Sequence, residues 1–118
     1  MEIKIVEKSK NYIHKELAAG KWQQLSLMEQ MGNIGSEVSR ALNWRDKNQE
    51  SYNNAIDRAL ELLDLTINDS RWKNRLKEIA RVRELLCGAI SGGKEYKTSL
   101  KDLDGYFFHF ALAARVKR

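Results

Sequence analysis

The sequence lacks proline, and it has one cysteine, Cys87, among its 118 residues. Without proline, no amide hydrogen is missing from the interior of any helix. A single cysteine cannot close a disulfide within the chain, which fits a reducing compartment. No apolar run approaches the roughly 20 residues that span a bilayer, and the N-terminal "MEIKIVEKSK" is too polar for a secretory signal. We therefore expect a cytoplasmic protein that does not enter the membrane.

Aromatic residues are also scarce, with three Phe, three Trp and four Tyr, whereas Ala, Leu, Glu, Lys and Arg are frequent. This composition favours helices over sheets, and the length suffices for one domain. We predict an all-α protein, an up-and-down four-helix bundle over residues 26–118, preceded by an additional N-terminal helix or arm over residues 1–25. The arm is open to two interpretations. Ile3 and Ile5 alternate as in a short strand, while helical spacing relates Ile3, Val6, Ile13 and Leu17.

Local start and stop signals set the boundaries of the four helices. Ser26 and Glu29 match a capping box, so the first helix should begin just after Ser26. Asp69 or Ser70 would cap the third helix, and the paired glycines 92–93 would end it. The polar residues 48–51 separate the first two helices. The predicted helices are therefore 27–47, 52–67, 70–91 and 99–116.

The first of these helices contains a strip of small residues, Gly32, Gly35, Ser36 and Ser39. Small side chains allow the backbone of a neighbouring helix to approach closely, and we predict close packing there. The alternative, a phosphate-binding loop over residues 32–35, would require a preceding strand, which the pattern does not provide. Cys87 lies in an apolar part of the third helix and is expected in the core.

Charge is unevenly distributed along the chain, whose net charge is +5. On the second helix, Asp57, Glu61 and Asp64 form an acidic row opposite the apolar side. Residues 70–83, "SRWKNRLKEIARVR", contain six Lys or Arg in fourteen positions. The folded surface should therefore have an acidic side and a basic side.

The basic residues of the third helix fall into a row on its outer side. Lys73, Lys77 and Arg81 recur at i, i+4 and i+8, a spacing that suits contacts with successive phosphates. Arg71 and Arg75 should instead cover the edge of the apolar side with their stems. A second basic group ends the last helix, where cations also suit the helix dipole. Its residues are Arg115, Lys117 and Arg118.

Arg83 is predicted to point into the apolar stripe of the third helix, which is formed by Trp72, Leu76, Ile79, Leu86 and Ile90. A buried guanidinium needs a carboxylate partner, because an unpaired buried charge costs several kcal/mol. We expect a buried ion pair between Arg83 and Glu37, with Glu84 or Asp104 as alternative partners.

The last helix has two apolar sides. Besides the expected core side, Phe108, Leu112 and Val116 form an apolar row on nearly the opposite face. One small bundle cannot easily bury both. Two explanations are open: another protein molecule covers the second row, or the N-terminal helix does.

Sequence motifs for catalysis are missing. The two histidines, His14 and His109, belong to no metal-ligand cluster, and no glycine-rich loop follows a strand. Small helical ribonucleases of the toxin class carry an Arg four to six residues before a His, and neither histidine has one. We expect a non-enzymatic protein without a metal or cofactor.

Three stretches of the chain resemble a family of short uncharacterised bacterial helical proteins: "KWQQLSLMEQMGNIGSEVSRALNW", "AIDRALELLDLTINDSRWKNRLKEIARVRELLCG" and "YFFHFALAARVKR". The resemblance covers most of residues 21–118 and implies a helical fold without an assigned active site. In architecture, a small basic bundle is also similar to the accessory proteins of diversity-generating retroelements, which form rings and bind a reverse transcriptase and its RNA.

Two functional hypotheses follow. In the first, the protein is an accessory factor whose basic row and basic tip bind RNA or DNA, as part of a mobile-element or reverse-transcriptase complex. In the second, it is a homo-oligomeric protein–protein adaptor without nucleic-acid contact. There the acidic row Asp57, Glu61 and Asp64 would meet a basic row of a neighbour, with Phe108 and Leu112 in the contact.

Overall fold

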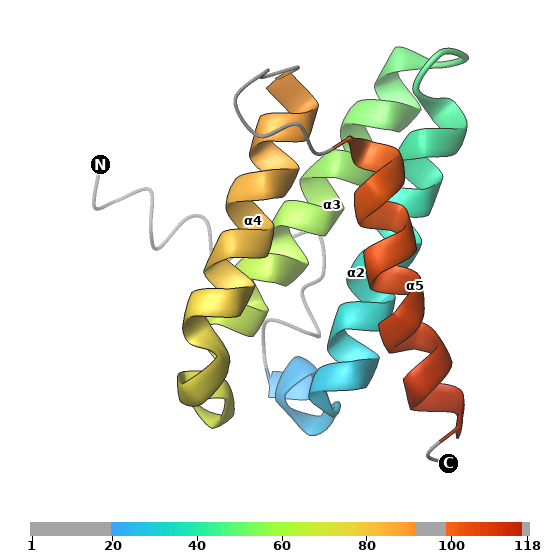
Figure 1. The fold of residues 1–118 in the computed structure, drawn as a ribbon. Helices are drawn as coiled ribbons and strands as arrows, with labels where there is room; N and C mark the ends of the chain where they lie inside the picture. Colours follow the sequence, from blue (N-terminus) through green and yellow to red (C-terminus); the bar gives the residue numbers. More distant parts are fainter. Residues whose placement is uncertain (1–19, 92–98, 117–118) are drawn as a thin grey trace.

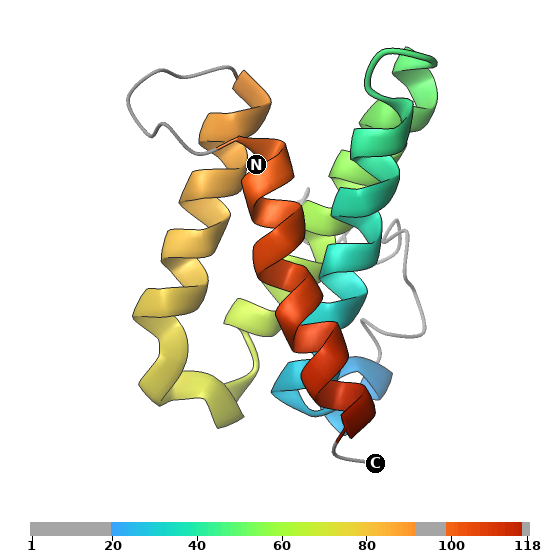
Figure 2. The same cartoon turned by 45° about the vertical axis from the view of Figure 1, so that its right-hand side comes forward.

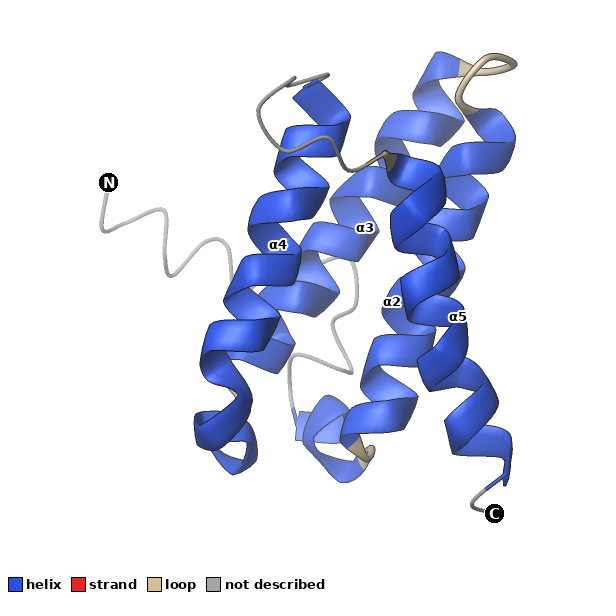
Figure 3. Ribbon diagram, viewed as in Figure 1, coloured by secondary structure: helices blue, strands red, loops and turns tan. Residues whose placement is uncertain are grey.

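The computed structural model describes residues 20–91 and 99–116 and confirms the all-α four-helix bundle. Successive helices run in opposite directions, and no strand occurs within the described ranges (Figures 1 and 3). The α-helices are α2 (Leu27–Trp44), α3 (Gln49–Ile67), α4 (Leu76–Ser91) and α5 (Leu100–Val116). Two short 3-10 helices, η2 (Trp22–Gln24) and η3 (Ser70–Arg75), precede α2 and α4.

Side-chain caps define where the helices start. Ser26 and Glu29 form the predicted capping box on α2, and Ser99 forms an equivalent pair of hydrogen bonds with Asp102 at the start of α5. The predicted gap between the first two helices, residues 48–51, is displaced along the chain, because the observed gap is at residues 45–48. Asn48 accepts a hydrogen bond from the amide of Ser51 and starts α3 at Gln49, and α2 ends at Trp44 rather than near residue 47.

The helix α2 is central, because it packs closely against both α3 and α5. The predicted close packing of its glycines is confirmed on the α5 side. A Cβ on Gly35 would lie 2.5 Å from the Cβ of Phe107, and one on Gly32 would lie 3.1 Å from the Cα of Ala111. Real Cβ atoms do not tolerate the first of these distances, so glycine at position 35 sets how closely the two helices approach.

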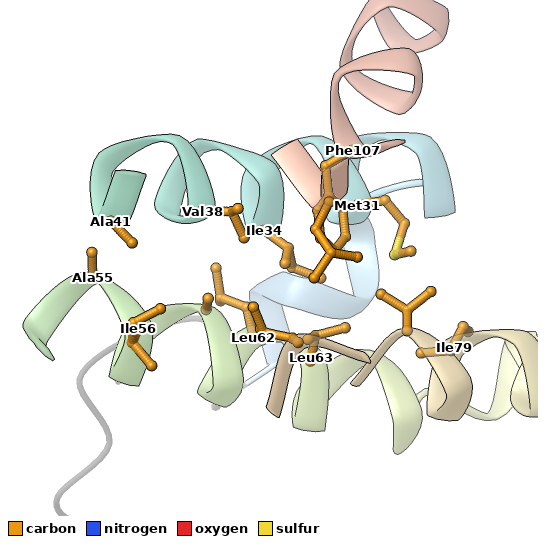
Figure 4. Close-up of a cluster of buried hydrophobic side chains, with 14 of the residues drawn as sticks. Met31, Ile34, Val38, Ala41, Ala55, Ile56, Leu62, Leu63, Ile79 and Phe107 are labelled. Carbon is orange, nitrogen blue, oxygen red and sulfur yellow. The ribbon is translucent and has the colours of Figure 1, made fainter. Parts of the chain in front are cut away.

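The hydrophobic core lies mainly between α2 and α3, and α4 and α5 complete it. Figure 4 shows α2 and α3 facing one another through their apolar side chains. Fully or nearly fully buried members from the four helices include Met31, Ile34, Val38, Ala41, Ala55, Ile56, Leu62, Leu63, Ile79 and Phe107. Burial of this apolar surface is the main favourable contribution to folding.

The predicted third helix is wrong at its beginning. Residues 70–75 form η3 instead of α-helix, and Trp72 has non-helical backbone angles (φ −105°, ψ 27°). One local and one long-range hydrogen bond explain the difference. Asp69 accepts a hydrogen bond from the amide of Arg71, and the indole Nε1 of Trp72 donates to Gln30 Oε1 at 2.9 Å. These bonds hold the segment in tighter turns, so α4 begins at Leu76.

The predicted buried pair of Arg83 and Glu37 is wrong. Arg83 donates from Nε to Asp64 Oδ1 at 2.7 Å, across the α3–α4 boundary, and its side chain is 36 % exposed. Glu37 is buried but pairs with Arg40 at 2.9 Å and faces Arg58 at 3.9 Å. Neither alternative partner, Glu84 or Asp104, pairs with Arg83.

The helix α4 is rotated about its axis relative to the prediction, and this rotation explains why Arg83 does not pair with Glu37. The helix buries Ile79, Val82 and Leu86, while Leu76, which was predicted on the apolar side, is 43 % exposed. Arg83 consequently lies at the edge of the buried stripe, where its head reaches solvent. Cys87 is exposed as well, contrary to the expectation of a core position.

The N-terminal part of the bundle starts before the predicted boundary at residue 26. Trp22 of η2 is completely buried in the common core. Residues 1–19, where the sequence predicts a helix or a strand from Ile3 to Leu17, lie outside the described residues. Among the described helices, none combines the length and apolar character that crossing a bilayer requires.

Candidate nucleic-acid interface

The predicted basic row is on the surface of η3 and α4. Lys73, Lys77 and Arg81 are all exposed. Lys73 and Lys77 form no ion pair or hydrogen bond with the part of the chain that the structure describes. Arg81 donates to Glu84 at 3.2 Å, and both side chains of this pair are mostly in solvent. Exposed pairs contribute about 0–1 kcal/mol, so another anion can displace Glu84 at little cost.

The basic row is less straight than predicted. Lys77 and Arg81 share one face of α4, because four residues make little more than one α-helical turn. Lys73 belongs to η3, where each turn takes about three residues, and it is therefore rotated away from that face. The three cations therefore follow a bent path along η3 and the start of α4, and these two segments lie at the lower end of α4 in Figure 1.

A buried carboxylate anchors the segment that carries the first of these cations. Asp69 is 4 % exposed and caps η3. Its Oδ2 accepts from Arg71 Nη2 at 2.7 Å and from Gln30 Nε2 at 3.0 Å, and its Oδ1 accepts from the Arg71 side chain and amide. Hydrogen bonding by Arg71 is the largest influence on Asp69 and outweighs burial, so the pKa of its carboxyl is lowered to about 2.

Gln30 extends this hydrogen-bonded network into the core. It is completely buried and donates to the carbonyl of Trp22 at 2.8 Å as well as to Asp69. The indole of Trp22 donates to Thr66 Oγ1 at 3.0 Å, and Thr66 donates to a carbonyl one turn earlier in α3. The network connects η2, α2 and the α3–η3 junction, and every polar side-chain group in it has a partner.

Next to this network lies an open cavity of about 710 Å³ between η3, the start of α2 and the end of α5. Its walls combine apolar and cationic side chains. The guanidinium of Arg71 lies 4.3 Å from the ring centroid of Trp72, and Arg75 pairs with Glu78 at 2.7 Å. The residues that line the cavity are Ser26, Leu27, Met28, Glu29, Arg71, Trp72, Asn74, Arg75 and Ala114.

The sequence did not identify this cavity. Arg71 and Arg75 were expected to cover apolar surface, and Trp72 was expected on the apolar side of a regular helix. Trp72 is only half-buried, and both arginines line the opening. The sequence feature that could have indicated the cavity is the aromatic residue Trp72 between Arg71 and Arg75. The cavity itself depends on the 3-10 geometry of η3, which the helical spacing does not indicate.

The basic tip of α5 is only partly described. Arg115 is exposed and pairs with none of the described residues, whereas Lys117 and Arg118 lie outside them. Ala114, directly before Arg115, lines the cavity beside Trp72. The fold therefore brings the end of α5 to the same region as η3, although the two segments are about 40 residues apart in the chain.

The other predicted surface residues lie elsewhere. On α3, Asp57 and Asp64 are exposed and Glu61 is half-buried, and Asp64 is already paired with Arg83. On α5, the predicted second apolar row is in solvent. Its exposed fractions are 56 % for Phe108, 43 % for Leu112 and 78 % for Val116.

Chemical groups that could form a metal centre do not cluster in residues 20–91 and 99–116, where no three His, Cys, Asp or Glu side chains come together. His109 is exposed beside Phe108, and His14 lies outside the described residues. Comparisons with protein-family models, curated proteins and solved structures found no match to this chain.

Proposed function

We propose that this protein binds nucleic acid, RNA or DNA, through the η3–α4 surface and acts as an accessory protein rather than as an enzyme. The observation that carries the proposal is the pair Lys73 and Lys77, two exposed cations without a carboxylate partner in the described chain. Most other cations near them, Arg71, Arg75 and Arg83, are held by acidic side chains. Lys73 and Lys77 therefore have their full charge available for phosphates.

Arg81 adds a third contact to this surface. Its pair with Glu84 is exposed on both sides, so a phosphate can take the place of the carboxylate. Lysine and arginine contacts to phosphate release counterions, which makes the affinity fall with added salt. Such contacts position a strand without selecting its sequence.

The neighbouring cavity favours a single strand over a duplex. Leu27 and Met28 offer apolar surface beside Trp72, and Arg75 lies at the same opening. An unpaired base can leave its stack and pack in such a cavity, while a paired base cannot reach it. We infer that one base enters the cavity while phosphates on the same strand contact Lys73 and Lys77.

The experiment is a titration of fluorescently labelled single-stranded RNA of mixed sequence with the full chain, at several salt concentrations. The Lys73→Glu/Lys77→Glu variant should bind more weakly. Because each phosphate contact on a single strand adds about 0.7 to the slope of log K against log salt, its slope should be smaller by about 1.4. A variant with unchanged affinity and slope would overturn the proposal.

A matched control carries the same change of charge at the α2–α3 turn. Arg45 and Lys47 are both exposed there, at the opposite end of the bundle from η3 (Figure 1). Arg45→Glu/Lys47→Glu should keep most of the affinity. Equal losses in the two variants would mean that net charge, and not the η3–α4 surface, governs binding. An unlabelled duplex of the same sequence should compete less well than the single strand.

A protein–protein adaptor is the second candidate, and the exposure of Phe108, Leu112 and Val116 favours it. The acidic row of α3 supports it less than the sequence suggested. Asp64 forms an ion pair with Arg83 in the same chain. Asp57 is exposed and forms no ion pair among the described residues, so it is the acid of this row that remains available.

A further inference from the structure

The outer side of α5 carries a continuous stripe that no described helix covers. In Figure 2 α5 lies in front of α2 and α3, and no other described helix passes in front of it. At 100° per residue, Phe108 and Leu112 form the middle of the stripe. Asp104 and Arg115 lie along one edge, and Gly105 and Val116 lie along the other.

Packing among the described residues does not explain why position 105 is a glycine. Glycine weakens a helix relative to alanine, and α2 places its glycines where α5 fills the space. A Cβ on Gly105 would instead meet nothing within 4 Å among the described residues. An exposed glycine beside an exposed Phe and Leu permits a second helix to come close to the backbone of α5.

The charges of the stripe complement those of a second copy. Asp104 near the start of α5 and Arg115 near its end lie on the same edge, eleven positions apart. Arg115 has no ion-pair partner in the described chain, and Asp104 accepts a hydrogen bond from Ser39 but forms no ion pair there. In a two-fold pair of parallel helices, the charged edge of one copy would lie against the partner's Gly105 and Val116, whereas two antiparallel copies bring each Asp104 to the partner's Arg115.

We propose that α5 pairs with α5 of a second copy, antiparallel and around a two-fold axis opposite residue 110. Residues 108 and 112 are equally distant from that axis, so Phe108 packs against the partner's Leu112 and Leu112 against the partner's Phe108. On one edge, Arg115 meets the partner's Asp104. On the other edge, Val116 packs over the partner's Gly105, where the missing side chain leaves room.

This pairing is independent of nucleic-acid binding, because the η3–α4 surface contributes nothing to it. The first test is sedimentation equilibrium of the full chain, which should give twice the 13.7 kDa of one chain at micromolar concentrations. Phe108→Ala should raise the dimer dissociation constant by about thirtyfold, as expected for a central aromatic contact. The control is Leu76→Ala, which removes another exposed leucine, on α4, and should leave the constant unchanged.

Charge exchange tests the antiparallel register. Asp104→Arg alone and Arg115→Asp alone should each weaken the dimer, because each creates two repulsive pairs. When the two variants are mixed, both ends of the charged edge of the mixed dimer regain an Arg–Asp pair, so dimers should form again. Arg115 has no partner within the described chain, so Arg115→Asp should fold normally, and circular dichroism checks both variants.

The control for charge is Asp57→Arg, a reversal of the same size on the exposed side of α3. It should leave the dimer intact. A chain that stays monomeric at all concentrations would overturn the proposal. Another part of the same chain that covered the stripe would also leave the chain monomeric, and it would overturn the proposal in the same way. A dimer that the α5 variants do not weaken, or that mixing does not restore, would overturn it too. The Lys73→Glu/Lys77→Glu variant should still sediment as a dimer.

Discussion

Replacing Asp69 with Asn should reveal how strongly the buried network holds η3 to the bundle. The carboxylate is 4 % exposed and accepts hydrogen bonds from Arg71 and Gln30. These interactions lower its pKa from 3.8 to about 2. Each pKa unit corresponds to 1.36 kcal/mol, so the charged form of Asp69 contributes roughly 2 kcal/mol to the free energy of unfolding.

The sign of the pH dependence follows from the lowered pKa. The contribution of Asp69 is fully present above its unfolded value of 3.8, and it is lost as the pH falls through about 2. The neutral amide that the substitution introduces resembles a protonated carboxyl. Asp69→Asn should therefore lower the free energy of unfolding by roughly 2 kcal/mol at pH 6, and by less than about 1 kcal/mol at pH 2.5.

Urea unfolding followed by circular dichroism measures both differences. The exposed carboxylate Asp57, replaced with Asn, serves as the control and should change the free energy of unfolding by less than about 0.5 kcal/mol at either pH. A loss for Asp69→Asn that is the same at pH 6 and pH 2.5 would refute the reasoning. It would mean that the side chain stabilises η3 by its shape and not by its charge.

Two further predictions concern α2 and α5. Gly35→Ala should lower the free energy of unfolding by about 1–3 kcal/mol, because its Cβ would lie 2.5 Å from the Cβ of Phe107. Gly105→Ala, measured by the same urea unfolding at concentrations where the chain is monomeric, should raise it by about 0.5–1 kcal/mol, since that Cβ has no atom of the described residues within 4 Å. Burial, together with the nearby carboxylate of Glu78, raises the pKa of Tyr106 to about 12. An ultraviolet titration should show a late-ionising tyrosine that Tyr106→Phe removes.

The sequence was most informative where the relevant contacts are local. The capping box of Ser26 and Glu29 depends on residues three positions apart, and it was predicted correctly. The apolar row of α5 was also predicted to be on the surface side, although what covers it stayed open. A helix with two apolar sides exceeds what a single core can bury, and this follows from spacing alone.

Long-range polar contacts could not be predicted. The hydrogen bonds of Gln30 with Asp69 and Trp72 join residues 39 and 42 positions apart, and nothing in their local sequence indicates the pairing. The same contacts tighten η3 and shift the start of α4. A helix drawn as regular from residue 70 therefore points Arg83 in the wrong direction, which is why Asp64 and not Glu37 is its partner.

The exposed position of Cys87 makes this protein convenient for spectroscopy. It is the one thiol of the chain, and it lies on α4 in solvent, with Arg83 Nη1 3.6 Å from its sulfur. A maleimide spin label added to the natural sequence therefore attaches at a single place. Two labels related by a two-fold axis give one interspin distance, whereas isolated chains give none, so the wild-type thiol can report on assembly without any engineered cysteine.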